Sequence, residues 1–251
     1  MTQQTLTRLR NLKLTGMADA VQQQLEHAST YEGLPFIERL SLLVEHEQLS
    51  REQRKQTRLV KQARLKLQAT VQELDYQSAR NLERSQVANL AQGEWLRRGQ
   101  NLLITGPCGC GKTYLACALG YQACQQGHST RYYRLPRLLL ELSQAKVDGS
   151  YARLLGQLAR IELLILDDWG LEAVNAEQRN ALLEIMDDRY GKYSTIVVSQ
   201  LPTEEWYASL GDNTLADAIL DRLMHNAHRL PLKGESMRKR RSELTQSEQS
   251  S

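Results

Sequence analysis

Eight consecutive residues, 106–113, carry the strongest chemical signal in the sequence. They read Gly-Pro-Cys-Gly-Cys-Gly-Lys-Thr and lie between a short apolar run, 102–104, and a stretch with helical periodicity. A glycine-rich turn that opens a helix presents backbone N–H groups to a phosphate, the lysine adds a mobile positive charge, and the threonine hydroxyl is a ligand for Mg²⁺. The sequence therefore predicts a site for ATP and magnesium.

This loop supplies most of the predicted nucleotide contacts. Glycine at 109 and 111 allows backbone conformations and close approaches that a Cβ would obstruct, so successive amides converge on the β-phosphate. We expect Lys112 to reach the β- and γ-phosphates and Thr113 to bind the metal. The predicted cofactor-binding residues of the loop are Gly106, Pro107, Cys108, Gly109, Cys110, Gly111, Lys112, Thr113 and Tyr114.

A second apolar run, 163–166, ends in two acids, Asp167 and Asp168. Parallel sheets bind ligands at the carboxyl ends of their strands, so these acids are expected beside the phosphate loop. We expect Asp167 to be the magnesium carboxylate. Asp168 is then the group that orients and deprotonates the attacking water, a role that needs a carboxylate near the γ-phosphate. The alternative for Asp168 is a helix cap.

Four polar residues further along the chain are weaker candidates for the same site. Gln200 follows the apolar run 196–198 and either hydrogen-bonds the γ-phosphate or the attacking water, or is only a turn residue. Arg222 lies in a helical stretch, and Arg229 and Arg238 follow it. The residue pattern alone does not select a catalytic arginine.

The scaffold that must position these residues is an α/β fold. From residue 100 onward, short apolar runs alternate with longer amphipathic segments, which is typical of a parallel sheet covered by helices. We expect an ATPase domain over 76–241 and a disordered tail over 242–251, which is rich in Ser and Gln. The predicted strands centre on 102–104, 130–133, 163–166 and 196–198, and the predicted helices are 112–126, 135–158 and 176–190.

Residues 1–75 form a separate all-helical domain in this interpretation. They contain two glycines and one proline, and their apolar residues recur at helical spacing. Pro35 is tolerated in a first helical turn and predicts a helix start. The core face of that helix is predicted to consist of Ile37, Leu40, Leu43 and Val44.

Basic residues concentrate at the end of this helical domain. From 51 to 66 there are seven basic residues against one acid, and most of them share one helical face. The two interpretations are a solvated helix surface and a contact to the phosphate backbone of DNA. The basic residues are Arg51, Arg54, Lys55, Arg58, Lys61, Arg64 and Lys66, and the predicted DNA contacts are the first five.

The composition limits the classes of protein to which the chain can belong. A chain of 251 residues with 41% hydrophobic content buries one good core, and the formal net charge of +3 says little about partners. No run approaches the roughly 18 apolar residues of a membrane span, so we expect a cytoplasmic protein. The four cysteines lack metal-type pairing and are expected to be reduced thiols; they are Cys108, Cys110, Cys117 and Cys124.

The loop 106–113, the acids at 167–168, Gln200 and the Asp221-Arg222-Leu223 stretch together resemble the AAA+ ATPases of the helicase-loader and initiator group, and most of all the IstB-type transposition helpers. The resemblance implies that Arg222 is an arginine finger that acts on a neighbouring subunit's nucleotide. It also implies that Gln200 is the first sensor and Arg238 the second. The active protein would then be a homo-oligomer, a ring or helical assembly.

The resemblance further implies assembly on duplex DNA and delivery of a transposase, with strand cleavage left to that partner. Loaders and initiators carry an extra helical element, here about 135–160, and its basic residues Arg137, Lys146 and Arg153 are second-choice DNA contacts. Asp168 replaces a common Glu and Gln200 a common Asn, which predicts slow hydrolysis. Two other functions stay open: a replicative helicase loader of the DnaC type, and a scaffold that binds ATP without turnover.

Overall fold

The computed structural model describes residues 2–76, 80–211, 213–234 and 236–237, and the chain divides into two compact units between Arg58 and Leu59. The sequence grouped residues 59–75 with the N-terminal helices. In the structure they pack with the second unit, because Leu59 and Ala63 bury against Cys124, and Ala69 and Leu74 enter that unit's core. None of the described helices is long and apolar enough to cross a membrane.

The first unit is helical. The start of α2 is fixed against α4, since the Met17 amide donates to the Glu47 carboxylate at 3.0 Å and His46 Nδ1 lies 2.9 Å from the Gly16 carbonyl oxygen. The helices are α1 (Thr2–Asn11), α2 (Thr15–Glu26), α3 (Ala28–Tyr31) and the first part of α4 (Phe36–Ala63).

The predicted start of α4 beside Pro35 is confirmed, but its predicted core face is wrong. Ile37 is 65% exposed and Val44 51% exposed, while Leu40 and Leu43 are half-buried. The reason is that α2 contacts α4 at Arg39 and around Glu47, on a face of α4 other than the one that carries Ile37 and Val44. The first unit therefore presents an apolar helix face to its surroundings.

The basic helix is also shorter than expected. Helix α4 ends at Ala63, and Arg64 takes a left-handed conformation with φ of 49°. Lys66 therefore does not continue the basic face. Its Nζ lies 3.7 Å from Asp167 Oδ2, at the predicted nucleotide site of the second unit.

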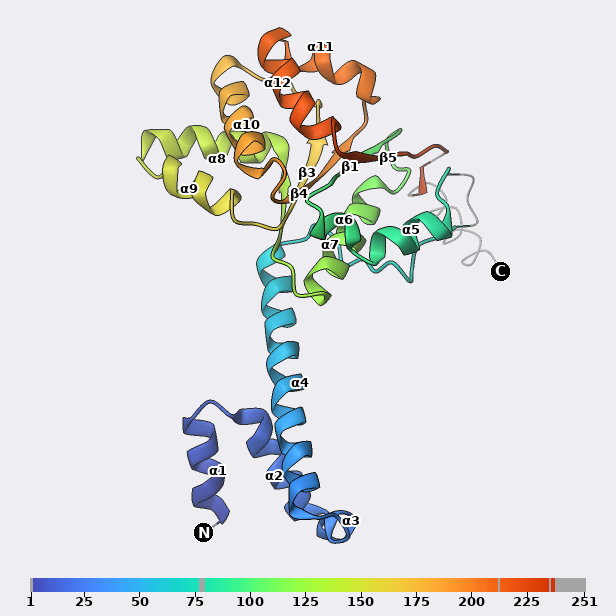
Figure 1. The fold of residues 1–251 in the computed structure, drawn as a ribbon. Helices are drawn as coiled ribbons and strands as arrows, with labels where there is room; N and C mark the ends of the chain where they lie inside the picture. The colour runs from blue at the N-terminus through green and yellow to red at the C-terminus, as the bar shows by residue number, and fades with distance from the viewer. Residues whose placement is uncertain (1, 77–79, 212, 235, 238–251) are drawn as a thin grey trace, which may run out of the picture. The chain divides into compact units, whose positions relative to one another are not determined.

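The second unit is built on a five-stranded sheet in the order β2-β3-β4-β1-β5, with every neighbouring pair parallel (Figure 1). The strands are β1 (Asn101–Thr105), β2 (Thr130–Arg134), β3 (Leu163–Trp169), β4 (Ser194–Ser199) and β5 (Ala227–Pro231). The first four were predicted. The edge strand β5 was not, because Leu230 is its one fully buried residue and it gives no apolar run.

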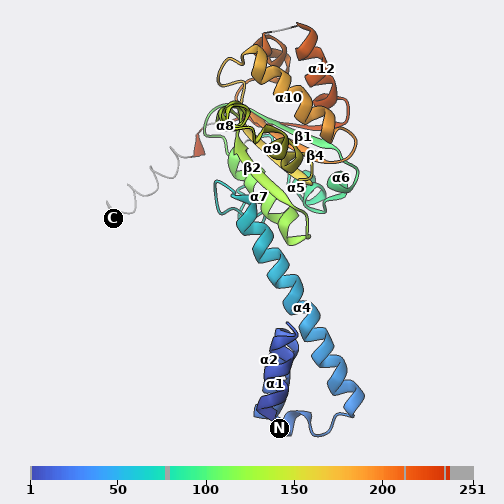
Figure 2. The same ribbon diagram turned by 90° about the vertical axis from the view of Figure 1, so that its left-hand side faces the viewer.

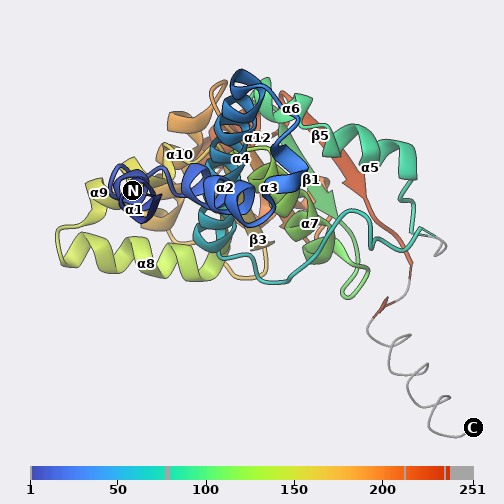
Figure 3. The same ribbon diagram turned by 90° about the horizontal axis from the view of Figure 1, so that it is seen from below.

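Helices cover both faces of this sheet. One face carries α5 (Arg84–Ala91), α6 (Glu94–Arg97) and α7 (Lys112–Gln125), and the other carries α8 (Leu135–Val147), α9 (Tyr151–Leu158), α10 (Ala176–Arg189) and α12 (Asn213–Met224) (Figures 1 and 2). After β4 come η1 (Thr203–Glu205) and α11 (Trp206–Leu210). The α/β class is therefore confirmed. The single helix predicted over 135–158 is two helices, which Figure 3 shows as a hairpin.

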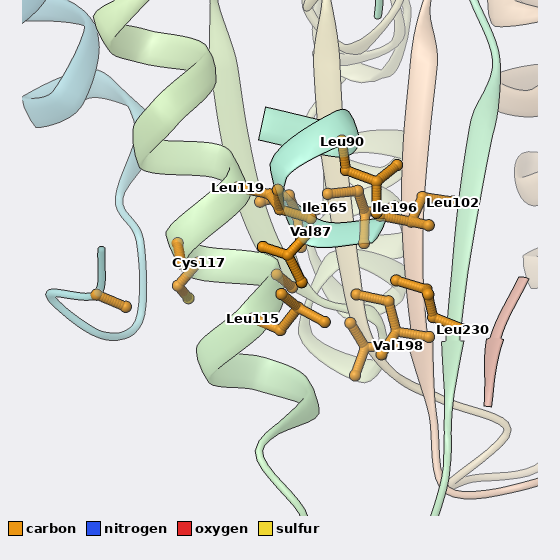
Figure 4. Close-up of a cluster of buried hydrophobic side chains, with 14 of the residues drawn as sticks. Val87, Leu90, Leu102, Leu115, Cys117, Leu119, Ile165, Ile196, Val198 and Leu230 are labelled. Atoms are coloured by element: carbon orange, nitrogen blue, oxygen red, sulfur yellow. The ribbon is translucent and has the colours of Figure 1, made fainter. Parts of the chain in front are cut away.

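The alternation of side chains along β1 explains the two cores. Leu102 and Ile104 bury toward α5 and α7, whereas Leu103 buries toward α8, α10 and α12. Figure 4 shows the first of these clusters, in which Leu115 and Leu119 of α7 lie over the strands. Each such side chain contributes about 1.5–3 kcal/mol through burial. The packing fixes α7 against the strand that leads into the phosphate loop.

Candidate nucleotide site

The phosphate loop joins the carboxyl end of β1 to the start of α7. Gly111 is the N-cap residue of α7, with φ of 96°, so the helix opens at Lys112 as the sequence predicted. Gly106 has φ of 142°, and a Cβ at this position would lie 2.3 Å from the Leu232 carbonyl oxygen. The chain that follows β5 therefore crosses so close to the loop that only glycine fits at its first position.

Lys112 is buried and held by the loop itself. Its Nζ donates to the carbonyl oxygens of Gly106 at 2.6 Å and Pro107 at 2.7 Å. Cys110 is buried beside it, whereas Cys108 is exposed. A lysine in this position supplies its charge at the mouth of the loop, where helix α7 directs its first amides.

A cleft of about 270 Å³ lies beside the loop. The loop contributes Gly109, Gly111, Lys112, Thr113 and Tyr114, and the segment before α5 contributes the opposite wall: Leu67, Glu73, Leu74, Asp75 and Arg80. Tyr114 does reach this cleft, and its hydroxyl donates to Glu73 at 3.1 Å. The predicted cofactor residues are thus joined by a strap, residues 64–76 and 80–82, that the sequence did not assign to the site.

Thr113 and Asp167 are brought together as predicted. The Thr113 hydroxyl donates to Asp167 Oδ2 at 2.9 Å, and the Tyr132 hydroxyl donates to the same oxygen at 2.6 Å. Burial raises the pKa of Tyr132, and its hydrogen bond to Asp167 raises it further, so this phenol stays a donor at neutral pH. Tyr132 orients the carboxylate, a contact that the sequence analysis missed.

This donor set fits magnesium. Within the part of the chain that the structure describes, no three His, Cys, Asp or Glu side chains gather as a metal cage. A hydroxyl and one carboxylate, adjacent at the loop, are instead the sparse hard-oxygen set that suits Mg²⁺, which keeps several waters and binds phosphate oxygens as well. Thr113 and Asp167 are the residues that would hold it.

A bulge at the end of β3 turns both acids toward this edge of the sheet. The pairing of β3 with β4 shifts between Leu166 and Trp169, and Asp168 takes a left-handed φ of 64°. In a regular strand successive side chains point to opposite faces, whereas a bulge re-aims one of them. The Asp168 side chain consequently reaches the end of β2, where it pairs with Arg134 at 2.5 Å.

Gln200 lies at the same edge. It follows Ser199, whose partner in the β1–β4 ladder is Thr105, the residue before the loop. Its side chain is exposed. The structure therefore brings the predicted sensor position next to the phosphate loop, at the carboxyl end of β4.

Arg222 is not at this edge. Asn101, the first residue of β1, donates its side-chain amide to the Arg222 carbonyl oxygen at 3.2 Å, so Arg222 belongs to the amino end of the strands. At about 3.3 Å per residue, the five residues of β1 separate it from the loop by well over 10 Å. Its guanidinium donates to Asp187 at 2.7 Å. Arg238, the predicted second sensor, lies outside the described residues, as does the predicted tail 242–251.

The predicted DNA contacts of the first unit gather around a shallow depression. Its lining is entirely basic, namely Lys13, Arg51, Arg54, Lys55 and Arg58. Arg51 and Arg54 share one acid, Glu47, at 2.6 and 3.6 Å. Lys13, in the turn between α1 and α2, was not predicted. Lys61, the fifth predicted contact, is exposed further along α4, in the second unit.

The second-choice DNA contacts differ in whether their side chains already pair with other groups of the protein. Arg137 and Arg153 are exposed on α8 and α9. Lys146 is engaged, because it pairs with Glu177 at 3.0 Å and lies over the Tyr151 ring, 4.8 Å from its centroid.

The parallel sheet, the phosphate loop and the acidic end of β3 together define a P-loop nucleotide-binding domain of the AAA+ class, joined to a helical N-terminal region. Comparison with known sequences identifies the family. The chain belongs to the IstB-like ATP-binding proteins, whose family model matches residues 7–245.

Several curated relatives are named as ATP-binding proteins of insertion sequences. An insertion sequence ATP-binding protein of Sinorhizobium fredii is 48% identical over 235 residues, which are 94% of this chain and 96% of the relative. The IS1162 ATP-binding protein of Pseudomonas fluorescens is 50% identical over 204 residues, 81% of this chain and 88% of the relative. The IS21 ATP-binding protein of Pseudomonas aeruginosa is 36% identical over 230 residues, 92% and 86% of the two chains.

Solved structures share the fold. The crystal structure of DnaI superposes with a TM-score of 0.58 at 21% identity and covers 66% of this chain and 91% of its own. The crystal structure of the DnaC helicase loader superposes with a TM-score of 0.57 at 20% identity, and the match covers 66% of this chain and 97% of the loader chain. The structure of DnaA bound to AMPPCP and single-stranded DNA superposes with a TM-score of 0.58 at 16% identity, and the match covers 68% of this chain and 52% of the DnaA chain. At such identities the likeness establishes the fold alone.

Proposed function

We propose that this protein is a magnesium-dependent ATPase that assembles on duplex DNA and acts as the helper that regulates target selection by the transposase of an insertion sequence. We further propose that it works in the cytoplasm as a homo-oligomer. One observation carries the catalytic part: the bulged end of β3 presents Asp168 next to a second acid, Asp167, that already contacts Thr113.

The residues divide the work of phosphoryl transfer. Lys112 binds the β- and γ-phosphates, and Thr113 with Asp167 holds Mg²⁺, which supplies neutralisation of phosphate charge. Asp168 orients the attacking water and takes its proton. Gln200, exposed beside the loop, hydrogen-bonds the γ-phosphate or that water.

The location of Arg222 supports assembly. A guanidinium at the amino end of the strands is too far from its own phosphate loop, so it serves a neighbour in a head-to-tail contact. Its ion pair with Asp187 does not prevent this, because Asp187 is 63% exposed and a pair of this kind contributes about 0–1 kcal/mol. A second subunit then completes each site.

The first unit supports binding to DNA and to protein. A depression lined by five cations and no acid suits the phosphate backbone. Exposed apolar side chains on the same unit, among them Leu12, Phe36 and Ile37, suit a protein partner, either the transposase or another copy. A helical domain that combines both surfaces fits a protein that joins DNA to a transposase.

ATP turnover with and without duplex DNA, combined with electron microscopy of the same samples, tests the proposal. We expect DNA to stimulate turnover and ATP to produce rings or filaments on the duplex. Absence of duplex binding, together with capture of a replicative helicase, would instead support a DnaC-type loader. ATP binding without turnover on DNA would support a scaffold.

A further inference from the structure

Arg80 is a buried cation without a counter-charge among the described residues. It is 5% exposed, and within the described ranges no carboxylate pairs with it and its Nε and Nη2 have no hydrogen-bond partner. The one hydrogen bond that its side chain makes within the described residues is long, 3.4 Å from Nη1 to the Cys110 carbonyl oxygen. A buried charge left unpaired is strongly unfavourable, so we expect an anion to bind this side chain.

The backbone holds Arg80 against the phosphate loop. Its carbonyl oxygen accepts from the Lys233 amide at 3.0 Å, and the neighbouring Asn81 side chain donates to the Pro231 carbonyl oxygen at 3.0 Å. Both bonds tie this part of the strap to the end of β5. The segment is therefore anchored beside the loop by two hydrogen bonds.

The guanidinium is aimed at the start of α7. A Cβ on Gly111, the N-cap residue, would lie 2.8 Å from Arg80 Nη1, and Arg80 lines the same cleft as Lys112 and Thr113. The N-terminus of a helix is where a phosphate binds. Nε and Nη2 form one edge of the guanidinium fork, which matches two oxygens of one phosphate.

We propose that Arg80 is a nucleotide ligand, which binds the phosphate chain common to ATP and ADP through its guanidinium. The inference rests on the proposed ATP-dependent function and adds a residue from outside the phosphate loop to its site. Arg80 closes the cleft from the side of the strap, opposite Lys112. Nucleotide binding would thereby fix the strap against the loop.

Calorimetric titration of the full-length protein with ATP and with ADP tests this assignment. We expect Arg80→Met to weaken both by about 10- to 100-fold, the loss of hydrogen bonds to a charged group, and Arg80→Lys to weaken them less. Arg84→Met is the matched control, because Arg84 is exposed over the Tyr76 ring and does not line this cleft. It should bind as the parent does.

Thermal unfolding without nucleotide separates a ligand from a structural residue. Removing an unpaired buried charge should leave the Tm unchanged or raise it, whereas loss of a structural arginine would lower it. Parental affinity of Arg80→Met for ATP and ADP, or a lower Tm with Arg80→Lys as well, would overturn the assignment. If the parent binds ATP and Lys112→Ala does not, such a result defeats only this inference; if the parent itself fails to bind ATP, the proposed function fails.

Discussion

Arg134 and Asp168 form an ion pair at the edge of the sheet, with Arg134 Nε donating to Asp168 Oδ2 at 2.5 Å. They end neighbouring strands, β2 and β3, and the left-handed backbone of Asp168 is what turns its carboxylate toward the arginine. The hydrogen bond to Asp168 raises the pKa of Arg134. The ion pair occupies one carboxylate oxygen of Asp168, so it restrains the group that we assign to water activation.

Replacing Arg134 should therefore release Asp168. We expect Arg134→Gln to raise the rate of ATP hydrolysis in the absence of DNA and to reduce the factor by which DNA stimulates it. Steady-state phosphate release at saturating ATP measures both. The control is Arg131→Gln on the same strand, whose guanidinium bonds the Gln62 carbonyl oxygen instead. Slower hydrolysis by Arg134→Gln would mean that the arginine positions Asp168 rather than restraining it.

Replacing Asp168 itself should separate binding from turnover. We expect Asp168→Asn to bind ATP as the parent does and to lose about 10²-fold or more in turnover, the usual contribution of a general base. Electron microscopy should then find ATP-loaded assemblies that persist on DNA. Asp148→Asn is the control, because that carboxylate is exposed and accepts hydrogen bonds locally, from the side chain and the amide of Ser150. Hydrolysis at the parental rate by Asp168→Asn would remove it from the mechanism.

The sequence predicted the candidate site best where residues of a known chemical motif follow directly after an apolar strand. The loop 106–113 and the acids at 167–168 were identified because an apolar strand precedes each, and parallel strands deliver their carboxyl ends to one edge. The same rule applied to the strand 130–134 would have found Tyr132 and Arg134. It was not applied there because a tyrosine and an arginine at a strand end carry no motif of their own.

Other features depend on tertiary packing that periodicity does not report. Strand β5 gives no apolar run because it is an edge strand with mostly exposed residues. The core face predicted for α4 failed because helical periodicity marks an apolar face but not whether anything covers it. Arg80 shows the same limit, since the hydrogen bonds that hold Arg80 and Asn81 in place reach residues 233 and 231, far along the chain.

The basic depression of the first unit makes DNA binding sensitive to salt. About six to ten phosphate contacts would lose on the order of 10³ to 10⁵ in affinity between about 50 and 200 mM salt. Lys55 and Arg58 are the best positions to test, because Arg51 and Arg54 share Glu47.

We expect the double change Lys55→Gln and Arg58→Gln to weaken duplex binding and to reduce the salt slope by about 2, roughly one unit for each lost contact. Fluorescence anisotropy with a labelled duplex, measured across a salt series, gives this slope. The control removes the same charge from Arg97 and Arg98, which are exposed beside Glu94 in the second unit. A flat salt response of the parent would exclude the depression as a DNA contact.

Arg222 provides the test of a site shared between subunits. We expect Arg222→Ala to lose about 10³- to 10⁵-fold in turnover, the range for an arginine finger, with ATP binding retained. Mixing it with Asp168→Asn should restore part of the activity, because one variant keeps the water-activating acid and the other keeps the finger. Random one-to-one mixing places both intact groups at about one junction in four of a head-to-tail assembly. If the mixture stays inactive while electron microscopy shows mixed assemblies on DNA, Arg222 does not act on a neighbour's nucleotide.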